Sequence, residues 1–285
     1  MNLPVNSRWV RANGTRTHYS ECGEGKPLIA LHGGGAGSSG KSGLGLVMPL
    51  LGRARRVLAP DSIGGFGQTD PTASVRYGLI SRAQHTGDFI DALCLDKVSM
   101  AGNSQGAWSG VYYAMLHPDR VEKLILISSL TIAMSMGIKQ EPNDAMRALV
   151  GYNGTREGMK DLLEALIVDK SRITDALIDD RQSTVEQPGA WASFRRMADG
   201  WDYVRNDPVL KLQNDWREKL PALTRAIPTM ILWGRQDPFA LPATGQALAE
   251  MLPDVRVEWV DDAGHQVQTD QPERTADIIR DFLDG

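Results

Sequence analysis

Short apolar runs alternate with longer amphipathic segments along most of the chain. Six runs of four to six residues, rich in Val, Ile and Leu, cover residues 27–31, 56–59, 97–101, 123–127, 229–233 and 255–260. Such runs are typical of strands that are buried on both faces of a mostly parallel sheet. Helical patterns over residues 79–95, 107–116, 244–252 and 273–283 follow four of them. The sequence therefore predicts repeated strand–helix units and an α/β fold.

The alternation stops after residue 130, and residues 141–223 are nearly all helical in pattern and richer in charge. We interpret residues 131–225 as a helical cap inserted into a core of residues 1–130 and 226–285, over the carboxyl ends of the strands, where open α/β sheets bind ligands. Residues 9–22 predict an antiparallel pair at the sheet edge, turned at Asn13-Gly14. The cap offers six apolar side chains for a pocket, although core packing explains some of them equally well: Met134, Met136, Met146, Trp191, Phe194 and Met197.

Composition, charge and cysteine count argue against several classes of protein. The 285 residues are 42% apolar, carry a net charge of −4 and contain no dense basic block, which argues against disorder and nucleic-acid binding. Residues 1–13 lack the apolar stretch of a signal peptide, and serines and threonines interrupt the longest apolar stretch, residues 124–138. Two cysteines cannot form a disulfide framework or a Cys-based zinc site. We expect a cytoplasmic protein with a small-molecule substrate and no metal, cofactor, nucleic-acid or membrane partner; a homo-oligomer stays open.

The strongest chemical signal is the sequence Gly102-Asn103-Ser104-Gln105-Gly106, which follows a buried run and opens a helical pattern. A G-x-S-x-G sequence in this context places the serine on a sharp strand-to-helix turn with its hydroxyl exposed. Side chains two residues before and after the serine would clash at such a turn, and the two glycines remove them. We therefore predict that Ser104 is a nucleophile.

A serine nucleophile needs a base and a residue that orients the base. On this type of turn the acid and the base follow the serine in the order Ser, Asp, His, each just after a strand. Asp237 follows the run at 229–233, and His265 follows the run at 255–260. We predict that His265 takes the Ser104 proton and that Asp237 fixes the imidazole tautomer.

A glycine loop, His-Gly-Gly-Gly at residues 32–35, comes directly after the run at 27–31. Such a loop donates one backbone N–H to an oxyanion hole, and the residue after the nucleophile donates the second. We assign these donors to Gly34 and Gln105. Residues 35–42 also fit the string of a phosphate-binding loop, but such a loop should run straight from strand into helix, and three residues intervene here.

These residues resemble the α/β-hydrolase superfamily and, within it, the meta-cleavage product hydrolases, which cleave carbon–carbon bonds in ring-fission products of aromatic catabolism. The resemblance covers most of the chain, through residues 32–37, 61, 66–70, 102–104 and 233–237 and through the cap segments 155–157, 168–174 and 177–181. It implies the α/β-hydrolase fold, with a mostly parallel central sheet flanked by helices and an inserted helical cap. It also implies hydrolysis of a carbon–carbon bond in a 2-hydroxy-6-oxo-dienoate.

The resemblance further implies the substrate contacts. Arg181 matches the family arginine that binds the substrate carboxylate, for which a planar guanidinium is well suited. Asn103 is expected near the dienol end of the substrate, and Gly33 and Gly35 are expected to line the site. Gln266 belongs to this set as well, at a position where the family commonly has tryptophan.

Three differences from the family keep an alternative function open, and one of them is an extra residue within 63–65, after Asp61. Besides Gln266, the chain has Gly43 or Ser42 where the family commonly has asparagine. A carboxylic ester or lactone hydrolase with the same triad is therefore the alternative. An intact triad argues against a protein that only binds a ligand, and Ser104 argues against epoxide hydrolases and haloalkane dehalogenases, which need aspartate there.

Overall fold

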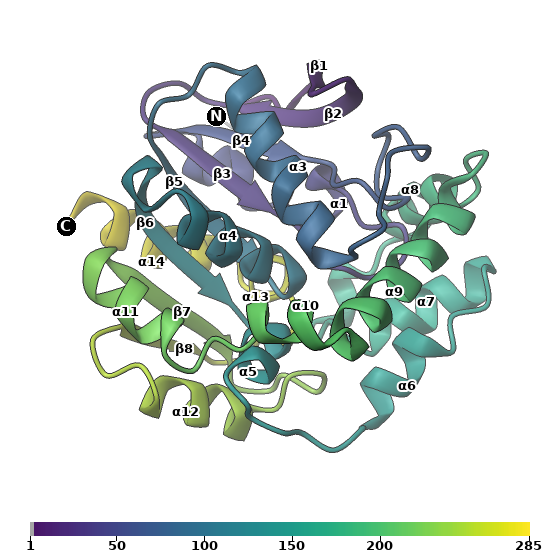
Figure 1. The fold of residues 1–285 in the computed structure, drawn as a ribbon. Helices are drawn as coiled ribbons and strands as arrows, with labels where there is room; N and C mark the ends of the chain where they lie inside the picture. Colours follow the sequence, from purple (N-terminus) through teal and green to yellow (C-terminus); the bar gives the residue numbers. More distant parts are fainter. Residues whose placement is uncertain (1–2) are drawn as a thin grey trace.

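The apolar runs form one eight-stranded sheet in the computed structural model, which describes residues 3–285 (Figure 1). The strands are β1 (Asn6–Ala12), β2 (Thr15–Cys22), β3 (Pro27–Leu31), β4 (Arg56–Pro60), β5 (Val98–Asn103), β6 (Val121–Ile127), β7 (Thr229–Gly234) and β8 (Arg256–Val260). They lie in the order β1-β2-β4-β3-β5-β6-β7-β8. Strands β3 to β8 are parallel to one another, whereas β2 is antiparallel to both β1 and β4. The predicted mostly parallel sheet is confirmed.

The predicted hairpin at the sheet edge is also present. Strands β1 and β2 pair from Ala12 opposite Thr15 onward. Asn13 and Gly14, between the strands, have φ values of 44° and 84°. Tight two-residue hairpin turns need positive φ at both central positions, which asparagine and glycine adopt most easily.

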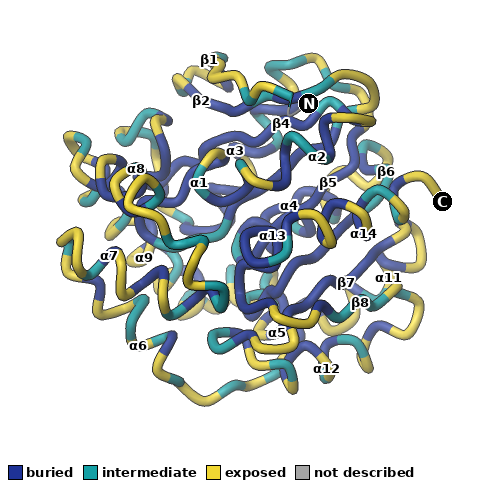
Figure 2. Tube along the Cα trace, turned by 180° about the vertical axis from the view of Figure 1, so that it is seen from behind, coloured by how far each residue is buried: buried dark blue, intermediate teal, exposed yellow. Residues whose placement is uncertain are grey.

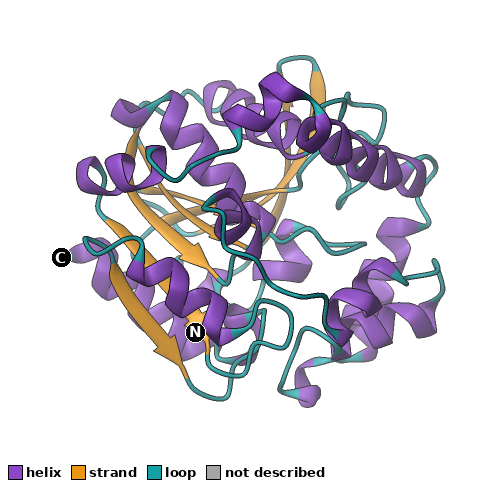
Figure 3. Cartoon of the chain, turned by 60° about the horizontal axis from the view of Figure 1, so that its bottom comes forward, coloured by secondary structure: helices purple, strands orange, loops and turns teal. Residues whose placement is uncertain are grey.

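Helices cover both faces of the sheet (Figures 2 and 3). Helices α3 (Leu79–Ala92), α4 (Gln105–Leu116) and α11 (Lys219–Ala226) cover one face, whereas α2 (Met48–Leu51) and α14 (Pro272–Asp284) cover the other. Three further helices contribute to the same two layers: α12 (Pro242–Glu250) packs Leu248 with the first group, and α1 (Gly40–Leu44) and α13 (Val267–Asp270) pack Leu44 and Val267 with the second. Helix α3 ends before the predicted residue 95, and Cys94 just beyond it has a φ of 53°.

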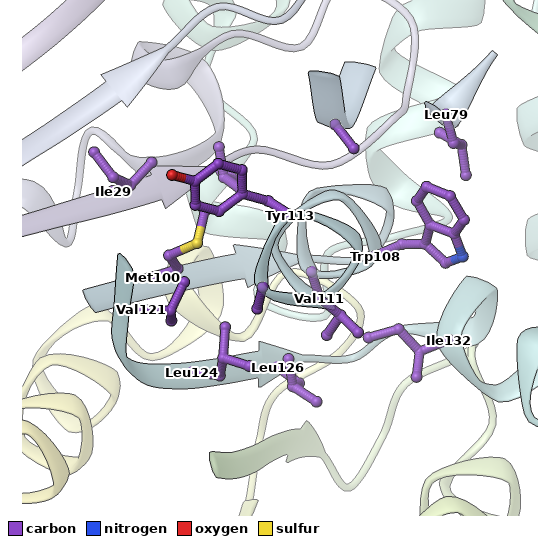
Figure 4. Close-up of a cluster of buried hydrophobic side chains, with 14 of the residues drawn as sticks. Ile29, Leu79, Met100, Trp108, Val111, Tyr113, Val121, Leu124, Leu126 and Ile132 are labelled. Carbon is purple, nitrogen blue, oxygen red and sulfur yellow. The ribbon is translucent and has the colours of Figure 1, made fainter. Parts of the chain in front are cut away.

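Two apolar cores lie on opposite faces of the sheet. Because successive side chains of a strand point to opposite faces, Ile29 and Leu31 join the core under α3 and α4, and Leu28 and Ala30 join the core under α14. Figure 4 shows the first of these cores, where Trp108 and Val111 of α4 lie among side chains of the sheet. The two cores fix the positions of the strands. The loops at the strand ends carry the candidate functional residues.

Seven helices and one short 3-10 turn (Lys170–Arg172) lie between β6 and β7 in the chain. The helices are α5 (Leu130–Ser135), α6 (Asp144–Val150), α7 (Arg156–Glu164), α8 (Asp175–Val185), α9 (Ala190–Asn206), α10 (Pro208–Gln213) and the sheet-covering α11. In Figure 1, α6 to α9 gather on the side toward which β3 and β6 point. A third apolar core, built mainly from α7 and α8, belongs to this segment. No helix in residues 3–285 is long and apolar enough to cross a membrane.

Candidate active site

The predicted nucleophile lies between β5 and α4. Ser104 has a φ of 55°, a strained value for a non-glycine residue, and is 7% exposed. A Cβ atom on Gly102 would lie 2.4 Å from the backbone nitrogen of Ala107, and one on Gly106 would lie 2.3 Å from the carbonyl oxygen of Leu31. Both distances are far below a van der Waals contact. The two glycines are therefore required by the packing of the turn, as the sequence predicted.

Asp237 and His265 meet at the ends of β7 and β8. The Asp237 Oδ2 atom lies 3.0 Å from Nδ1 of His265, and Oδ1 accepts hydrogen bonds of 2.8 Å from the backbone N–H groups of Phe239 and Ala240. Three donors thus hold a carboxylate that is 2% exposed. This contact leaves Nε2 of His265 as the ring atom available to a hydroxyl. Within residues 3–285 no hydrogen bond joins His265 to Ser104, but both line one cavity, and such contacts often form only with substrate.

The side chain of Asn103 binds the loop that carries His265 (residues 261–266, the histidine loop) to the sheet. Its Nδ2 group donates to the carbonyl oxygen of His265 at 2.9 Å and to that of Ile127 at 3.3 Å. Asn103 is 2% exposed and lines the cavity, as do Gly33 and Gly35. The N–H groups of the Asn103 amide are therefore used in hydrogen bonds within the protein, and only the amide oxygen is left for other partners.

A second buried carboxylate, that of Asp270, also binds the histidine loop. Asp270, 1% exposed, accepts hydrogen bonds from the backbone N–H groups of Gly264 (2.8 Å), Val168 (2.9 Å) and Asp169 (2.8 Å). Burial raises the pKa of Asp270, while these hydrogen bonds oppose that shift. Because Val168 and Asp169 belong to the helical insertion, Asp270 joins the insertion to the histidine loop.

The glycine loop and the start of α4 bring the two predicted oxyanion donors to the cavity. Gly34 and Gln105 both line it, and a Cβ atom on Gly34 would lie 2.0 Å from Oε1 of Gln105. Within the described residues neither backbone N–H has a hydrogen-bond acceptor. Two free N–H groups beside a serine at a helix N-terminus suit an oxyanion.

Arg181 of α8 is 1% exposed, and no carboxylate within residues 3–285 pairs with it. Its one hydrogen bond, from Nη2 to Oε1 of Gln266, is 3.4 Å long, and its Nε and Nη1 atoms have no partner in the same part of the chain. Burial lowers its pKa to about 10, which leaves it protonated at neutral pH. An unsatisfied buried cation is costly, so this guanidinium is suited to an anionic ligand.

The site residues surround one cavity of about 410 Å³. Its apolar lining comes from Leu130, Met134, Met146, Leu149, Val150, Leu166, Trp201 and Phe239. Of the apolar side chains offered for the pocket, Met134 and Met146 line it, whereas Met136, Met197, Trp191 and Phe194 pack in or against a core. Met136 is buried in the sheet core, and the stacked rings of Trp191 and Phe194 pack against the core of the insertion.

Two buried residues near the site could not be predicted from the sequence. Asp270 lies on a four-residue helix, and Arg82 lies on α3, in a pattern that indicates only an amphipathic helix. Beside them, the Nδ1 atom of His32 lies 2.7 Å from the carbonyl oxygen of Gly33. No spacing in the sequence signals the contacts of Arg82 or Asp270, because their partners lie far away in the chain.

Comparison with known proteins agrees with this geometry. The model of the alpha/beta hydrolase family matches residues 28–278. The chain is 31% identical over 277 residues, 97% of this chain and 90% of the relative, to the 2-hydroxy-6-oxo-6-(2'-aminophenyl)hexa-2,4-dienoic acid hydrolase of Metapseudomonas resinovorans. It is 30% identical over 289 residues, 99% of this chain and 97% of the relative, to the 2-hydroxymuconate semialdehyde hydrolase of Pseudomonas sp. strain CF600.

A solved structure gives the same result. The meta-cleavage product hydrolase CumD of Pseudomonas fluorescens IP01, determined as a serine-to-alanine mutant with acetates, superimposes with a TM-score of 0.81 at 27% identity over 97% of both chains. The protein is therefore a hydrolase with the α/β-hydrolase fold. It belongs to the α/β-hydrolase family, beside the meta-cleavage product hydrolases.

Proposed function

We propose that the protein hydrolyses the C5–C6 bond of a 2-hydroxy-6-oxo-dienoate, with Ser104, His265 and Asp237 as its catalytic triad. The observation that carries this proposal is Arg181, a buried guanidinium without a carboxylate partner among the described residues, in the same cavity as Ser104. Every such substrate carries a C1 carboxylate that needs a cation once it is buried. The substrates named for the relatives support the same assignment.

The chemistry follows from the positions of these groups. Once the C2 enol has become a ketone, Oγ of Ser104 attacks the C6 carbonyl carbon, and Nε2 of His265 takes the hydroxyl proton. The N–H groups of Gly34 and Gln105 stabilise the alkoxide that forms at C6. When the C5–C6 bond breaks, its electron pair passes through the C3–C4 double bond to the C2 oxygen, which takes a proton. Water activated by His265 then hydrolyses the acyl-serine and releases a carboxylic acid.

The lining of the cavity indicates which end of the substrate lies where. Arg181, Gly35 and Gln266 form the polar part of the lining that suits the C1 carboxylate. Apart from the triad and oxyanion residues, most of the other lining side chains are apolar, among them Met146 and Trp201, and Arg205, which also lines the cavity, is paired with Asp202. We therefore assign the substituent on C6 to the class of apolar alkyl or aryl groups.

The helical insertion completes this site, and we propose that residues 131–225 act as its cap. The insertion has an apolar core of its own, and α8 supplies Arg181 to the cavity. Helices α5 and α11, at the two ends of the insertion, contact α4 of the sheet layer. The cytoplasmic location and the oligomeric state stay predictions.

The alternative function is hydrolysis of a carboxylic ester or lactone by the same triad. Gln266 favours it, because this residue follows the catalytic histidine and its side chain already accepts the one hydrogen bond that Arg181 makes. An ester needs the serine, the histidine and the oxyanion donors but no cation for a carboxylate. The two functions therefore make different demands on Arg181.

A matched pair of substrates tests the proposal. We would compare kcat/KM for 2-hydroxy-6-oxo-6-phenylhexa-2,4-dienoate with that for its C1 primary amide, which is neutral and similar in size. The proposal predicts cleavage of the acid and a loss of about 10²-fold or more for the amide, because a buried charge pair is lost. Turnover of p-nitrophenyl butyrate or a lactone, with no cleavage of the acid, would contradict it in favour of the alternative.

A further inference from the structure

Arg82 is a buried arginine that the reaction above does not use. It lies on α3, is 1% exposed, and has no carboxylate among its partners in residues 3–285. Burial lowers its pKa to about 9, so the guanidinium is charged at neutral pH. Burying a cation in this way is unfavourable unless its N–H groups find good acceptors. The acceptors of these N–H groups therefore identify the segments that the Arg82 guanidinium holds in place.

Apart from Ser62, the acceptors of Arg82 belong to the glycine loop and to Gln105. Its Nη2 atom donates to the carbonyl oxygen of His32, and its Nε atom donates to Oγ of Ser62 at 2.8 Å. Its Nη1 atom donates to the carbonyl oxygen of Gly33 at 3.5 Å and to Oε1 of Gln105 at 3.4 Å. One side chain therefore contacts both the glycine loop and the residue after the nucleophile.

The contact with the Gly33 carbonyl matters because this carbonyl and the Gly34 N–H belong to the same peptide group. In a trans peptide the C=O and N–H bonds point in opposite directions, and the described residues contain no cis peptide. A carbonyl held on the Arg82 side therefore directs the Gly34 N–H away from Arg82, and Gly34 lines the cavity. Hydrogen bonds accepted by a carbonyl also polarise its peptide group and strengthen the N–H as a donor.

His32 reinforces the same peptide. Its Nε2 atom accepts the backbone N–H of Ser62 at 3.1 Å, so the ring proton lies on Nδ1, which donates to the Gly33 carbonyl at 2.7 Å. Burial and the charge of Arg82 hold the pKa of His32 well below its ordinary value, which keeps the ring in this neutral tautomer. The Gly33 carbonyl thus accepts hydrogen bonds from His32 and Arg82, two residues that are not part of the cavity lining.

We propose that Arg82 is a positioning residue of the oxyanion hole: it fixes the Gly33–Gly34 peptide and the Gln105 side chain so that both N–H donors keep their spacing from Ser104. This inference rests on the proposed function, since it takes Gly34 and Gln105 as the oxyanion donors. The side chain of Gln105 transmits the constraint directly, because its Oε1 atom lies against Gly34 and accepts from Arg82. A merely structural Arg82 would affect stability and leave oxyanion stabilisation unchanged.

The test compares Arg82→Met with Arg55→Met, a matched control in which an arginine that is 7% exposed pairs with Asp284 away from the cavity. We would measure kcat and KM on the phenyl dienoate and on p-nitrophenyl butyrate, and the inhibition constant of a phenyl trifluoromethyl ketone, which forms an oxyanion on the serine. Removing one oxyanion donor typically costs about 10²–10³-fold in kcat. A misplaced donor should cost Arg82→Met about 10- to 100-fold in kcat.

The expected pattern is a fall in kcat on whichever substrate the wild type turns over, a change in KM of less than about threefold, and weaker ketone binding by the same factor as kcat. Arg55→Met should change none of these. If Arg82→Met does not fold, Arg82→Lys serves, because an ammonium cannot reach Ser62 and Gly33 together, and about a tenfold loss of kcat is expected. Unchanged kcat and ketone affinity in a folded variant would overturn the inference. A wild type that hydrolyses neither substrate would instead overturn the proposed function.

Discussion

Replacing Arg181 with methionine separates the roles that this buried arginine can have. Methionine is similar in length and fills the same space, but it has no charge and no N–H donor. The Arg181 side chain is 1% exposed and, within residues 3–285, makes a single long hydrogen bond, to Gln266. The substitution therefore breaks almost no contact within the protein, and its main effect should fall on an anionic ligand.

The expected magnitude follows from burial. Removing one partner of a buried charge pair commonly costs about 3–5 kcal/mol. At about 1.4 kcal/mol per factor of ten, this corresponds to a loss of about 10²- to 10⁴-fold in kcat/KM on a dienoate. A neutral ester buries no carboxylate, so its kcat/KM should change by less than about threefold.

The assay follows the loss of dienoate absorbance and the release of p-nitrophenol in parallel, with the melting temperature as a check on folding. Arg147→Met is the control, because Arg147 lies on the neighbouring α6 but is exposed and paired with Asp144. It should leave both rates unchanged. Equal losses on the dienoate and the ester in a folded Arg181→Met variant would refute the reasoning and make Arg181 a structural residue.

Further predictions concern the triad and the buried groups around it. His265→Ala should lower kcat by about 10³–10⁶-fold and Asp237→Asn by less, as steady-state kinetics would show; full activity in either variant would place the base or its orienting residue elsewhere. Asp270→Ala should lower the free energy of unfolding in urea by several kcal/mol, because three backbone N–H groups lose their acceptor; a loss below about 1 kcal/mol would contradict this account. Burial lowers the pKa of His85 to about 4, so the unfolded state binds more protons below pH 6.5. Stability should then fall with pH from about 6.5 to 4, by up to about 1.4 kcal/mol per unit, and His85→Gln should make this slope shallower; an unchanged slope would show that His85 is not its source.

The sequence revealed those features of the site that depend on local sterics or on the ends of strands. Gly102, Ser104 and Gly106 form a turn whose packing permits only glycine at two positions, so the motif itself contains the geometry. Asp237 and His265 follow consecutive apolar runs, and parallel strands bring their carboxyl ends to one edge of the sheet. Both predictions needed no knowledge of distant contacts.

The remaining features depend on contacts between residues far apart in the chain. Arg82 was indistinguishable from any arginine of an amphipathic helix, although it contacts a loop 50 residues away. Asp270 reaches Val168 across 102 residues. The helical insertion was predicted from a break in the strand–helix pattern. The sequence could not separate Met134 and Met146, which line the cavity, from the apolar residues that pack in a core, because helix periodicity does not tell which apolar face packs inward and which lines a cavity.

Product analysis tests the central claim most directly. Wild-type enzyme incubated with 2-hydroxy-6-oxo-6-phenylhexa-2,4-dienoate should yield benzoate and 2-hydroxypenta-2,4-dienoate in equal amounts. Ser104→Ala should bind the same compound, seen as a change in its absorption spectrum, and should retain less than about a thousandth of the wild-type kcat. Absence of benzoate with the wild type, or benzoate formation at more than about a tenth of the wild-type rate by Ser104→Ala, would contradict the claim that Ser104 cleaves the carbon–carbon bond.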